Sequence, residues 1–156
     1  MSDDPANANP EQLAPQLEPS ASPEAIRLAT SFQALADQLP NPWDESTDYF
    51  AAFAAGLAAE TALDGESFRR AAGLAAHYRI DLSPASAKLA AQGTQDSWGK
   101  DLADRFRALE QAMTGALGEL WLAHARGDGV IRVRMWLFGR GADGALIGLH
   151  SISTET

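Results

Sequence analysis

Two strand patterns joined by a short turn constrain the fold of this 156-residue chain more than any other feature. Residues 129–138 read GVIRVRMWLF and residues 145–153 read ALIGLHSIS. Apolar residues recur at every second position of the first segment, as on one face of a strand: Ile131, Val133, Met135 and Leu137. Between the segments, Asp143 and Gly144 tolerate the positive φ of a tight turn. The pattern predicts an antiparallel hairpin close to the last residues of the sequence.

Helical patterns fill most of the remaining chain. The strongest 3.6-residue period covers about residues 101–123, and weaker patterns predict helices over residues 65–76 and 84–91. Residues 50–57 fit either a helix or a short buried strand, and residues 77–83 are expected to form a short connection. Helices around a strand pair predict an α/β protein in which helices cover a sheet.

A single folded domain is predicted over residues 23–156. Residues 1–22 carry prolines among Asn, Ser and acidic residues, which is typical of a disordered leader. Ser22, Pro23 and Glu24 then combine a helix N-cap, a proline at the first helical position and an early acid. This helix should end before Pro40, with one buried face made of Leu28, Phe32, Leu35 and Leu39.

Composition excludes several classes of function. The formal net charge of −9 argues against sequence-independent binding to nucleic acid, because phosphates repel an acidic surface. The chain has no cysteine, which excludes disulfides, thiolate nucleophiles and cysteine metal sites. No apolar run approaches the roughly 18 residues of a membrane span, and no signal-peptide pattern is visible. We therefore expect a cytoplasmic protein without membrane contact.

Two sequence features that could suggest enzymatic chemistry have simpler explanations. The glycines of residues 139–144 match the dinucleotide pattern G-x-G-x-x-G, but a strand follows them where that chemistry needs a helix. His77, His124 and His150 share no metal-ligand spacing, so surface or helix-end positions are expected. A hydrolase built from scattered His, Asp and Ser residues stays an alternative. The expectation is a protein that is not an enzyme and has no cofactor of its own.

Three polar segments carry residues suited to a protein partner. Aromatic residues are common anchors at interfaces; Trp43 and Tyr49 flank an acidic stretch over residues 44–48, and Trp98 lies in a polar loop. The final residues, Thr154–Thr156, place a hydroxyl and two carboxylates directly after the hairpin, which suits a cation or a basic groove. The alternatives are that the acidic stretch is a solvated turn, that Trp98 folds back onto the core, and that the final residues are simply the end of the chain.

Taken together, these segments resemble the nuclease A inhibitor family. Residues 44–50, DESTDYF, are similar to the family's Ser-Glu-Ser-acid-Tyr-Pro-Phe stretch. Residues 94–99, TQDSWG, are similar to its Thr-Gln…Asp-Trp segment. A long helix, the hairpin and the final Glu155-Thr156 complete the order, so that the resemblance covers about residues 24–156.

The resemblance implies a three-layer α/β/α sandwich, with a small mixed or antiparallel sheet, that inhibits a sugar-nonspecific, metal-dependent nuclease of the ββα-metal class. It implies that the hydroxyl of Thr156 coordinates the nuclease's catalytic magnesium and that Glu45 takes the place of the scissile phosphate. Asp96 and Trp98, which Ser97 separates here, correspond to a second contact area. The magnesium belongs to the partner, so the inhibitor needs no metal of its own.

Two kinds of partner stay open. The first is a sugar-nonspecific nuclease, bound by an inhibitor that is expected to be a monomer when free. The alternative is a protein-interaction module of the same fold with a non-nuclease partner. Neither interpretation involves direct contact with nucleic acid.

Overall fold

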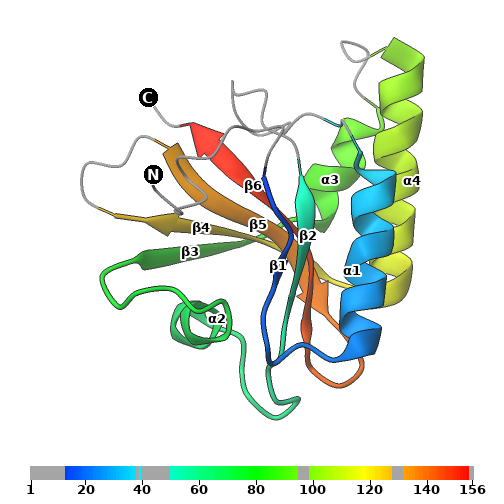
Figure 1. Ribbon diagram of the computed structural model, residues 1–156. Coiled ribbons are helices and arrows are strands. Elements are labelled where there is room, and N and C mark those ends of the chain that lie inside the picture. Colours follow the sequence, from blue (N-terminus) through cyan, green and yellow to red (C-terminus); the bar gives the residue numbers. More distant parts are fainter. Residues whose placement is uncertain (1–12, 38, 40–49, 95–98, 128–131, 155–156) are drawn as a thin grey trace.

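The computed structural model describes residues 13–37, 39, 50–94, 99–127 and 132–154. These residues form four helices and a six-stranded mixed sheet, so the α/β class is confirmed (Figure 1). The strands are β1 Gln16–Leu17, β2 Ala51–Ala55, β3 Arg79–Pro84, β4 Leu120–Arg126, β5 Arg132–Arg140 and β6 Leu146–Thr154. The helices are α1 Pro23–Leu35, α2 Gly65–Ala71, α3 Ser86–Gln92 and α4 Gly99–Leu117. The sheet order is β1-β2-β6-β5-β4-β3, with β1 parallel to β2 and the other neighbours antiparallel.

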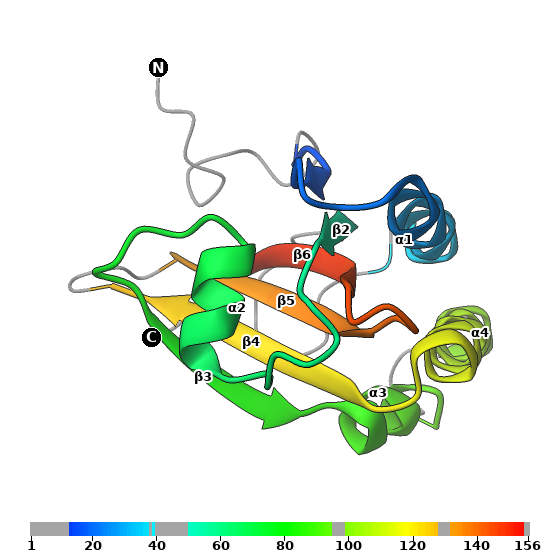
Figure 2. The same cartoon turned by 90° about the horizontal axis from the view of Figure 1, so that it is seen from below.

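Helices pack on both faces of the sheet because its central strands are apolar on both sides. Helices α1, α3 and α4 cover one face, and α2 covers the other (Figure 2). Met135 and Leu137 of β5 face the three helices, whereas Trp136 and Phe138 face α2. The ring centroid of Phe68, from α2, lies 5.1 Å from that of Trp136 and 5.0 Å from that of Phe138. The continuous apolar run in β5 therefore reflects burial on both faces.

The predicted hairpin is confirmed as β5 and β6, which pair along their full length. Gly144 in the connecting turn has a φ of 95°, a conformation that glycine adopts without a side-chain clash. The guanidinium of Arg140 donates hydrogen bonds to the carbonyls of Gly144, Thr61 and Ala58. Arg140 thus joins the hairpin turn to the loop that follows β2.

The longest helix ends earlier than the sequence predicts. Helix α4 stops at Leu117, and Gly118 has a φ of 74°, which turns the chain out of the helix. Residues 120–126, which include the end of the predicted helix, form β4. Leu120 keeps the helical spacing from Leu117, so the apolar period alone does not reveal where the helix ends. The positive φ of Gly118 therefore marks the end of the helix, which the apolar period does not reveal.

Three other segments refine or correct the sequence prediction. The ambiguous residues 51–55 form β2 and are buried throughout. Residues 79–83 were expected to lie in a connection and residue 84 to begin a helix, but residues 79–84 form the edge strand β3. Helix α2 ends at Ala71 and not at residue 76 as predicted, and Ala75 is exposed. The two strands form by pairing with β6 and β4, which are distant in the sequence, whereas Gly73, with a φ of 70°, turns the chain just after α2.

Helix α1 begins where the sequence predicts. The hydroxyl of Ser22 accepts a hydrogen bond from the backbone N–H of Ala25 at 3.1 Å, which is the expected N-cap. Of the predicted buried face, Phe32 and Leu39 are buried and Leu28 packs partly buried against the core, whereas Leu35 is exposed. Ala25 and Ala29 are buried on this face as well. Two alanines on this face allow the helix to lie close against the sheet.

Residues 13–22, which we call the N-terminal strap, are structured, so the prediction of a disordered leader is wrong for this part. The strap contains β1. The side-chain oxygen of Gln16 accepts hydrogen bonds from Trp136 Nε1 at 2.9 Å and from Arg134 at 3.0 Å. Its amide donates to the carbonyl of Ala72 at 2.9 Å. These partners lie at least 56 positions from Gln16 in the sequence, so no local pattern reports them.

The hairpin predicts a sharp contrast between two glycine substitutions. A Cβ at Gly148 would lie 2.1 Å from the carbonyl oxygen of Leu137 and 2.6 Å from the Cα of Phe138. Because both atoms belong to the backbone of β5, Gly148→Ala should lower the free energy of unfolding by about 3 kcal/mol or more. Urea unfolding of the purified variant measures this loss.

Gly115 provides the matched control. It lies within α4, and a Cβ there would meet no atom within 4 Å. Gly115→Ala should therefore raise the free energy of unfolding by roughly 0.5–1 kcal/mol, because alanine favours the helix. Equal effects of the two substitutions would contradict the close approach of β6 to β5.

Candidate functional site

The four residues that the family resemblance singles out, Glu45, Asp96, Trp98 and Thr156, lie outside the described residues. Their side chains are therefore not located by the structure. What the structure does locate is the set of elements that precede and follow the segments carrying them. The residues next to these segments define the candidate site.

Strand pairing brings the segment of Glu45 and the C-terminal segment to one part of the sheet. Ala51, at the start of β2, pairs with His150 of β6. Thr154, the last described residue, lies four positions further along β6, which corresponds to about 13 Å at roughly 3.3 Å per residue. The chain thus enters β2 beside the half of β6 that leads toward Thr156 (Figure 1).

Both ends of the segment over residues 40–49 are attached to the core. Before it, Leu39 is buried between α1 and the sheet. After it, Phe50 is buried in the same hydrophobic cluster. The side-chain oxygen of Gln33, on α1, accepts a hydrogen bond from the backbone N–H of Ala52 at 2.7 Å, which joins the helix to the start of β2. The positions at which this segment leaves and re-enters the core are therefore determined by packing.

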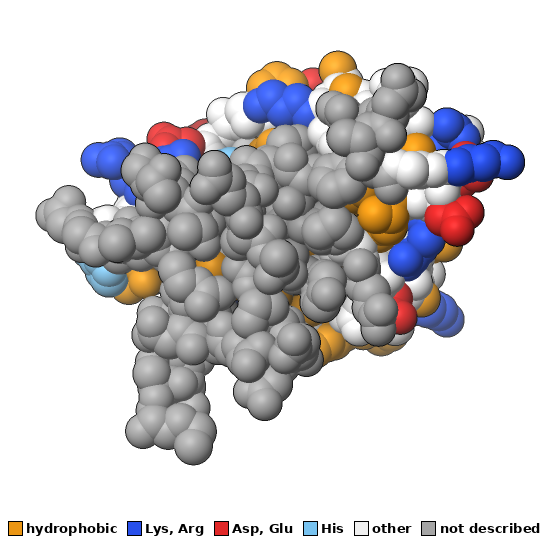
Figure 3. All heavy atoms as spheres, turned by 90° about the horizontal axis from the view of Figure 1, so that it is seen from above, with side chains coloured by type: hydrophobic (Ala, Val, Ile, Leu, Met, Phe, Trp, Pro, Cys, Tyr) orange, Lys and Arg blue, Asp and Glu red, His pale blue; other side chains and the backbone are white. Residues whose placement is uncertain are grey.

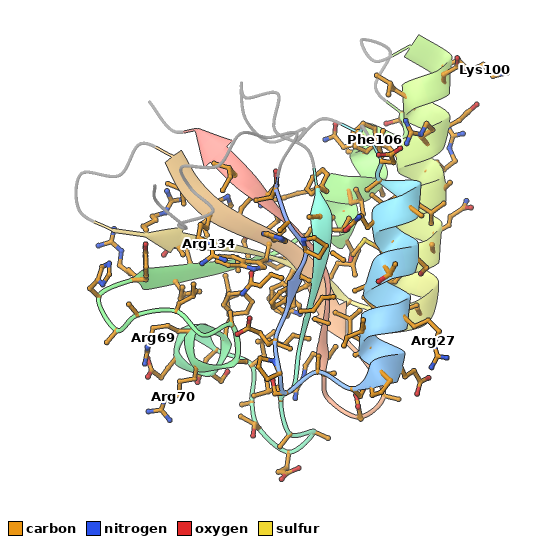
Figure 4. All side chains as sticks on the ribbon, in the orientation of Figure 1. Arg27, Arg69, Arg70, Lys100, Phe106 and Arg134 are labelled. Atoms are coloured by element: carbon orange, nitrogen blue, oxygen red, sulfur yellow. The ribbon has the colours of Figure 1, made fainter. Side chains whose placement is uncertain are left out.

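The segment that carries Asp96 and Trp98 starts and ends at the same end of the molecule. It connects α3 to α4, and the first turn of α4 lies at the upper end of the view, where Lys100 is labelled (Figure 4). Arg105 of α4 donates hydrogen bonds to carbonyls at the C-terminal end of α1. The start of α4 therefore lies beside the chain that leads toward Glu45.

Charges of both signs surround this end of the molecule. Figure 3 views it from above and shows basic and acidic side chains interspersed around its rim. In the first two turns of α4, acidic Asp101 and Asp104 alternate with basic Lys100, Arg105 and Arg107. The described surface is therefore not a uniform basic patch of the kind that binds nucleic acid through phosphates.

His150 is buried, which corrects the expectation of surface or helix-end histidines. Its Nε2 donates a hydrogen bond to the carbonyl of Ala14, in the N-terminal strap, at 2.8 Å. Burial lowers the pKa of His150 to about 4; the hydrogen bond to Ala14 raises this pKa, and the nearby Arg134 guanidinium lowers it. The His150 ring has little access to solvent, and one of its nitrogens is bonded to the strap. The ring therefore stabilises the fold by attaching the strap to β6.

The other two histidines lie in different surroundings. His77 is exposed, and His124 is half-buried on β4 and not at a helix end, because α4 stops before it. Among the described residues, no group of three or more His, Asp or Glu side chains is arranged to hold a metal ion. None of the helices in the described ranges is long and apolar enough to cross a membrane.

Among the hollows that described residues line, two, of about 340 and 470 Å³, lie at the opposite end of the molecule from the candidate site. The first lies between the start of α1 and the β5–β6 turn, and the second between the strap and α2. Neither is lined by a histidine, so neither contains a His-dependent acid–base pair. The hollows give no support to the hydrolase alternative.

The buried histidine predicts a loss of stability at acidic pH. Its pKa is about 4 in the folded chain, against 6.5 for an unperturbed histidine. Between these two pH values the imidazole of His150 binds a proton in the unfolded chain but not in the folded chain. The free energy of unfolding therefore falls as the pH decreases from about 6.5 to about 4. The loss attributable to this ring is at most roughly 3 kcal/mol.

His150→Gln tests this prediction, because glutamine can still donate to Ala14 but does not titrate. Denaturant unfolding at several pH values should show a smaller loss between pH 6.5 and 4 for the variant than for the unaltered chain. Identical profiles for His150→Gln and the unaltered chain would show that the ring is not buried in its neutral form.

Comparison of the sequence with protein-family models and with curated proteins gives no match in either case. The likeness to the nuclease A inhibitor family therefore stays an expectation that rests on the sequence segments quoted above.

Proposed function

We propose that this protein inhibits a sugar-nonspecific, metal-dependent nuclease by blocking its active site. The observation that carries the proposal is the register of β2 on β6, in which Ala51 pairs with His150. The segment of Glu45 and the segment of Thr156 therefore leave the sheet on neighbouring strands. A glutamate and a terminal hydroxyl that act together in one active site require this proximity.

The architecture also supports the proposal. The family resemblance implies an α/β/α sandwich, and helices α1, α3 and α4 pack on one face of the mixed sheet while α2 packs on the other. Rigid elements that hold short binding segments are a common arrangement in protein inhibitors, because little order has to be gained on binding.

The chemistry assigns a separate role to each segment. Magnesium prefers hard oxygen ligands and often keeps positions open for substrate oxygens, so the Thr156 hydroxyl would occupy one such position in the nuclease. The Glu45 carboxylate would lie against the cationic groups that normally bind the scissile phosphate. Trp98, with Asp96, would contribute a second contact area. The net charge of −9 favours association with the basic groove in which a nuclease binds nucleic acid.

An inhibition assay tests the proposal directly. The purified chain is titrated into a magnesium-dependent, sugar-nonspecific nuclease, and the degradation of double-stranded DNA is followed. We expect suppression at a one-to-one ratio. Glu45→Ala and a Gly-Ser extension after Thr156 should each weaken inhibition by about tenfold or more, because each removes a group placed at the centre of the interface.

Glu60→Ala is the matched control. Glu60 is exposed in the loop after β2, away from the candidate site, and its replacement changes the net charge by the same amount as Glu45→Ala. It should leave inhibition unchanged. Undiminished nuclease activity at a large excess of the chain, across several nucleases of this class, would reject the proposal. A non-nuclease partner recovered by affinity purification would then favour the alternative, an interaction module of the same fold.

Removal of the metal should distinguish the role of Thr156 from that of Glu45. If the hydroxyl coordinates the partner's magnesium, chelation should weaken the complex, and Thr156→Ala should remove most of this dependence on metal. Glu45→Ala should retain the dependence, because the carboxylate acts at the phosphate position. Calorimetric titration with and without EDTA measures the affinities; equal metal dependence in both variants would contradict direct coordination by Thr156.

A further inference from the structure

Strand β3 lies at the margin of the sheet, and one of its sides has no neighbour among the described strands (Figure 2). The register of β3 on β4, continued by one residue, places Ala85 opposite Leu120, and the backbone N–H of Ala85 donates to the carbonyl of Leu120 at 2.9 Å. In an antiparallel ladder, pairs that exchange hydrogen bonds alternate with pairs that do not. The odd-numbered residues of β3 therefore bond to β4, whereas the backbone groups of Ile80, Leu82 and Pro84 point outward.

The outward residues form a strand edge that is able to accept a further strand. Pro84 agrees with the assignment, because proline has no N–H to donate to β4. The side chains of Ile80 and Leu82 are only partly buried, at the rim of the cluster under α2. Gly65, at the start of α2, brings no side chain over the Ile80 carbonyl, since a Cβ there would lie 3.2 Å from the oxygen. Unpaired backbone groups of this kind are the template for strand addition.

The charges of β3 leave one arginine without an acidic partner. Arg79 lies directly opposite Arg126 of β4, and like charges in such a cross-strand pair repel each other. Arg126 is compensated by Asp81, because a carboxylate oxygen of Asp81 lies 2.6 Å from the Nε of Arg126. Within the described residues, the exposed guanidinium of Arg79 forms no ion pair. An added strand that brought a carboxylate to Arg79 would therefore be favoured.

A second copy of β3 supplies that carboxylate in one register. Two copies that pair antiparallel around a two-fold axis place outward residues opposite outward residues. With Leu82 opposite itself, Pro84 would lie opposite Ile80 and would lack the N–H for one hydrogen bond. With Ile80 opposite Leu82, the two Asp81 carboxylates would lie opposite each other and repel. With Ile80 opposite itself, Arg79 of each copy lies opposite Asp81 of the other.

We propose that the free edge of β3 binds a second copy of this chain, in the register that places Ile80 on the two-fold axis. The Asp81 of each copy then compensates the Arg79 of the other on one face of the joined sheet. On the opposite face, Tyr78, Ile80 and Leu82, which pack at the rim of the α2 cluster, extend this cluster from one copy to the other. The inference is independent of the proposed function and departs from the expectation of a monomer, because β4 and β5 separate this edge from β6.

Sedimentation equilibrium of the full chain tests the dimer. A single strand edge buries little area, so we expect weak association, which becomes measurable between about 10 and 500 µM. A salt concentration of about 0.15 M or more screens the repulsion between two copies of net charge −9. Arg79→Asp should raise the Kd of the dimer about tenfold or more, because it places two carboxylates opposite each other in both pairs.

Two further variants separate this effect from net charge and from stability. The double variant Arg79→Asp, Asp81→Arg exchanges the two side chains, keeps one acid beside Arg126 and should restore the dimer. Arg27→Asp, at an exposed position of α1 that Figure 4 labels, changes the net charge as Arg79→Asp does and should leave Kd within about twofold. A chain that stays monomeric over the whole concentration range, or an Arg79→Asp variant that associates as tightly as the unaltered chain, overturns the proposal.

Amide exchange followed by NMR at low and high protein concentration locates the interface. The N–H groups of Ile80 and Leu82 point outward and should exchange several-fold more slowly at high concentration. Those of Asp81 and Ser83 are bonded to β4 and should not change. Slower exchange elsewhere, without a change at Ile80 and Leu82, would show that the copies meet through another surface and would overturn the proposal. A chain that dimerises through β3 but inhibits no nuclease would contradict the proposed function alone.

Discussion

The pairing of β5 with β6 is the interaction on which the other parts of the structure depend. The two strands pair over their full nine-residue length, and β5 is buried on both faces. Its side chains form part of the cluster under α1, α3 and α4 and part of the cluster under α2. Both outer layers therefore pack on one strand. The close approach of Gly148 to the β5 backbone shows how little space separates the strands.

A buried polar network attaches the N-terminal strap to this central pair. Gln16 is bonded to Trp136 and Arg134 of β5, and His150 of β6 donates to the carbonyl of Ala14. The partners satisfy polar groups that would be costly to leave unpaired in the core. The strap therefore belongs to the folded domain, and it brings the start of the described chain to the half of β6 that precedes Thr154.

The candidate site shares this dependence on the sheet and on α4. The register of β2 on β6 sets where the segment of Glu45 and the C-terminal segment leave the sheet, and two arginines of α4 hold the preceding ends of α1 and α3. Helices and strands of the core thus set where the chain leaves and re-enters it on either side of these segments. In the function that we propose, the segments themselves would supply the oxygen ligands.

The sequence by itself determined the features that depend on neighbours in the chain. The hairpin with its Asp143-Gly144 turn and the Ser22 cap of α1 follow from local periodicity and turn chemistry. The resemblance to the nuclease A inhibitor family, and not local periodicity, singled out Glu45, Asp96, Trp98 and Thr156; these residues lie outside the described part of the chain and stay predictions. Only the tertiary structure decided that residues 120–126 are a strand and that the strap is ordered, because pairing partners and buried hydrogen bonds join residues far apart in the chain. It also decided that Arg105 and Arg107 donate hydrogen bonds to carbonyls at the ends of α1 and α3, since only packing brings these guanidinium groups to helix ends that are distant in the sequence.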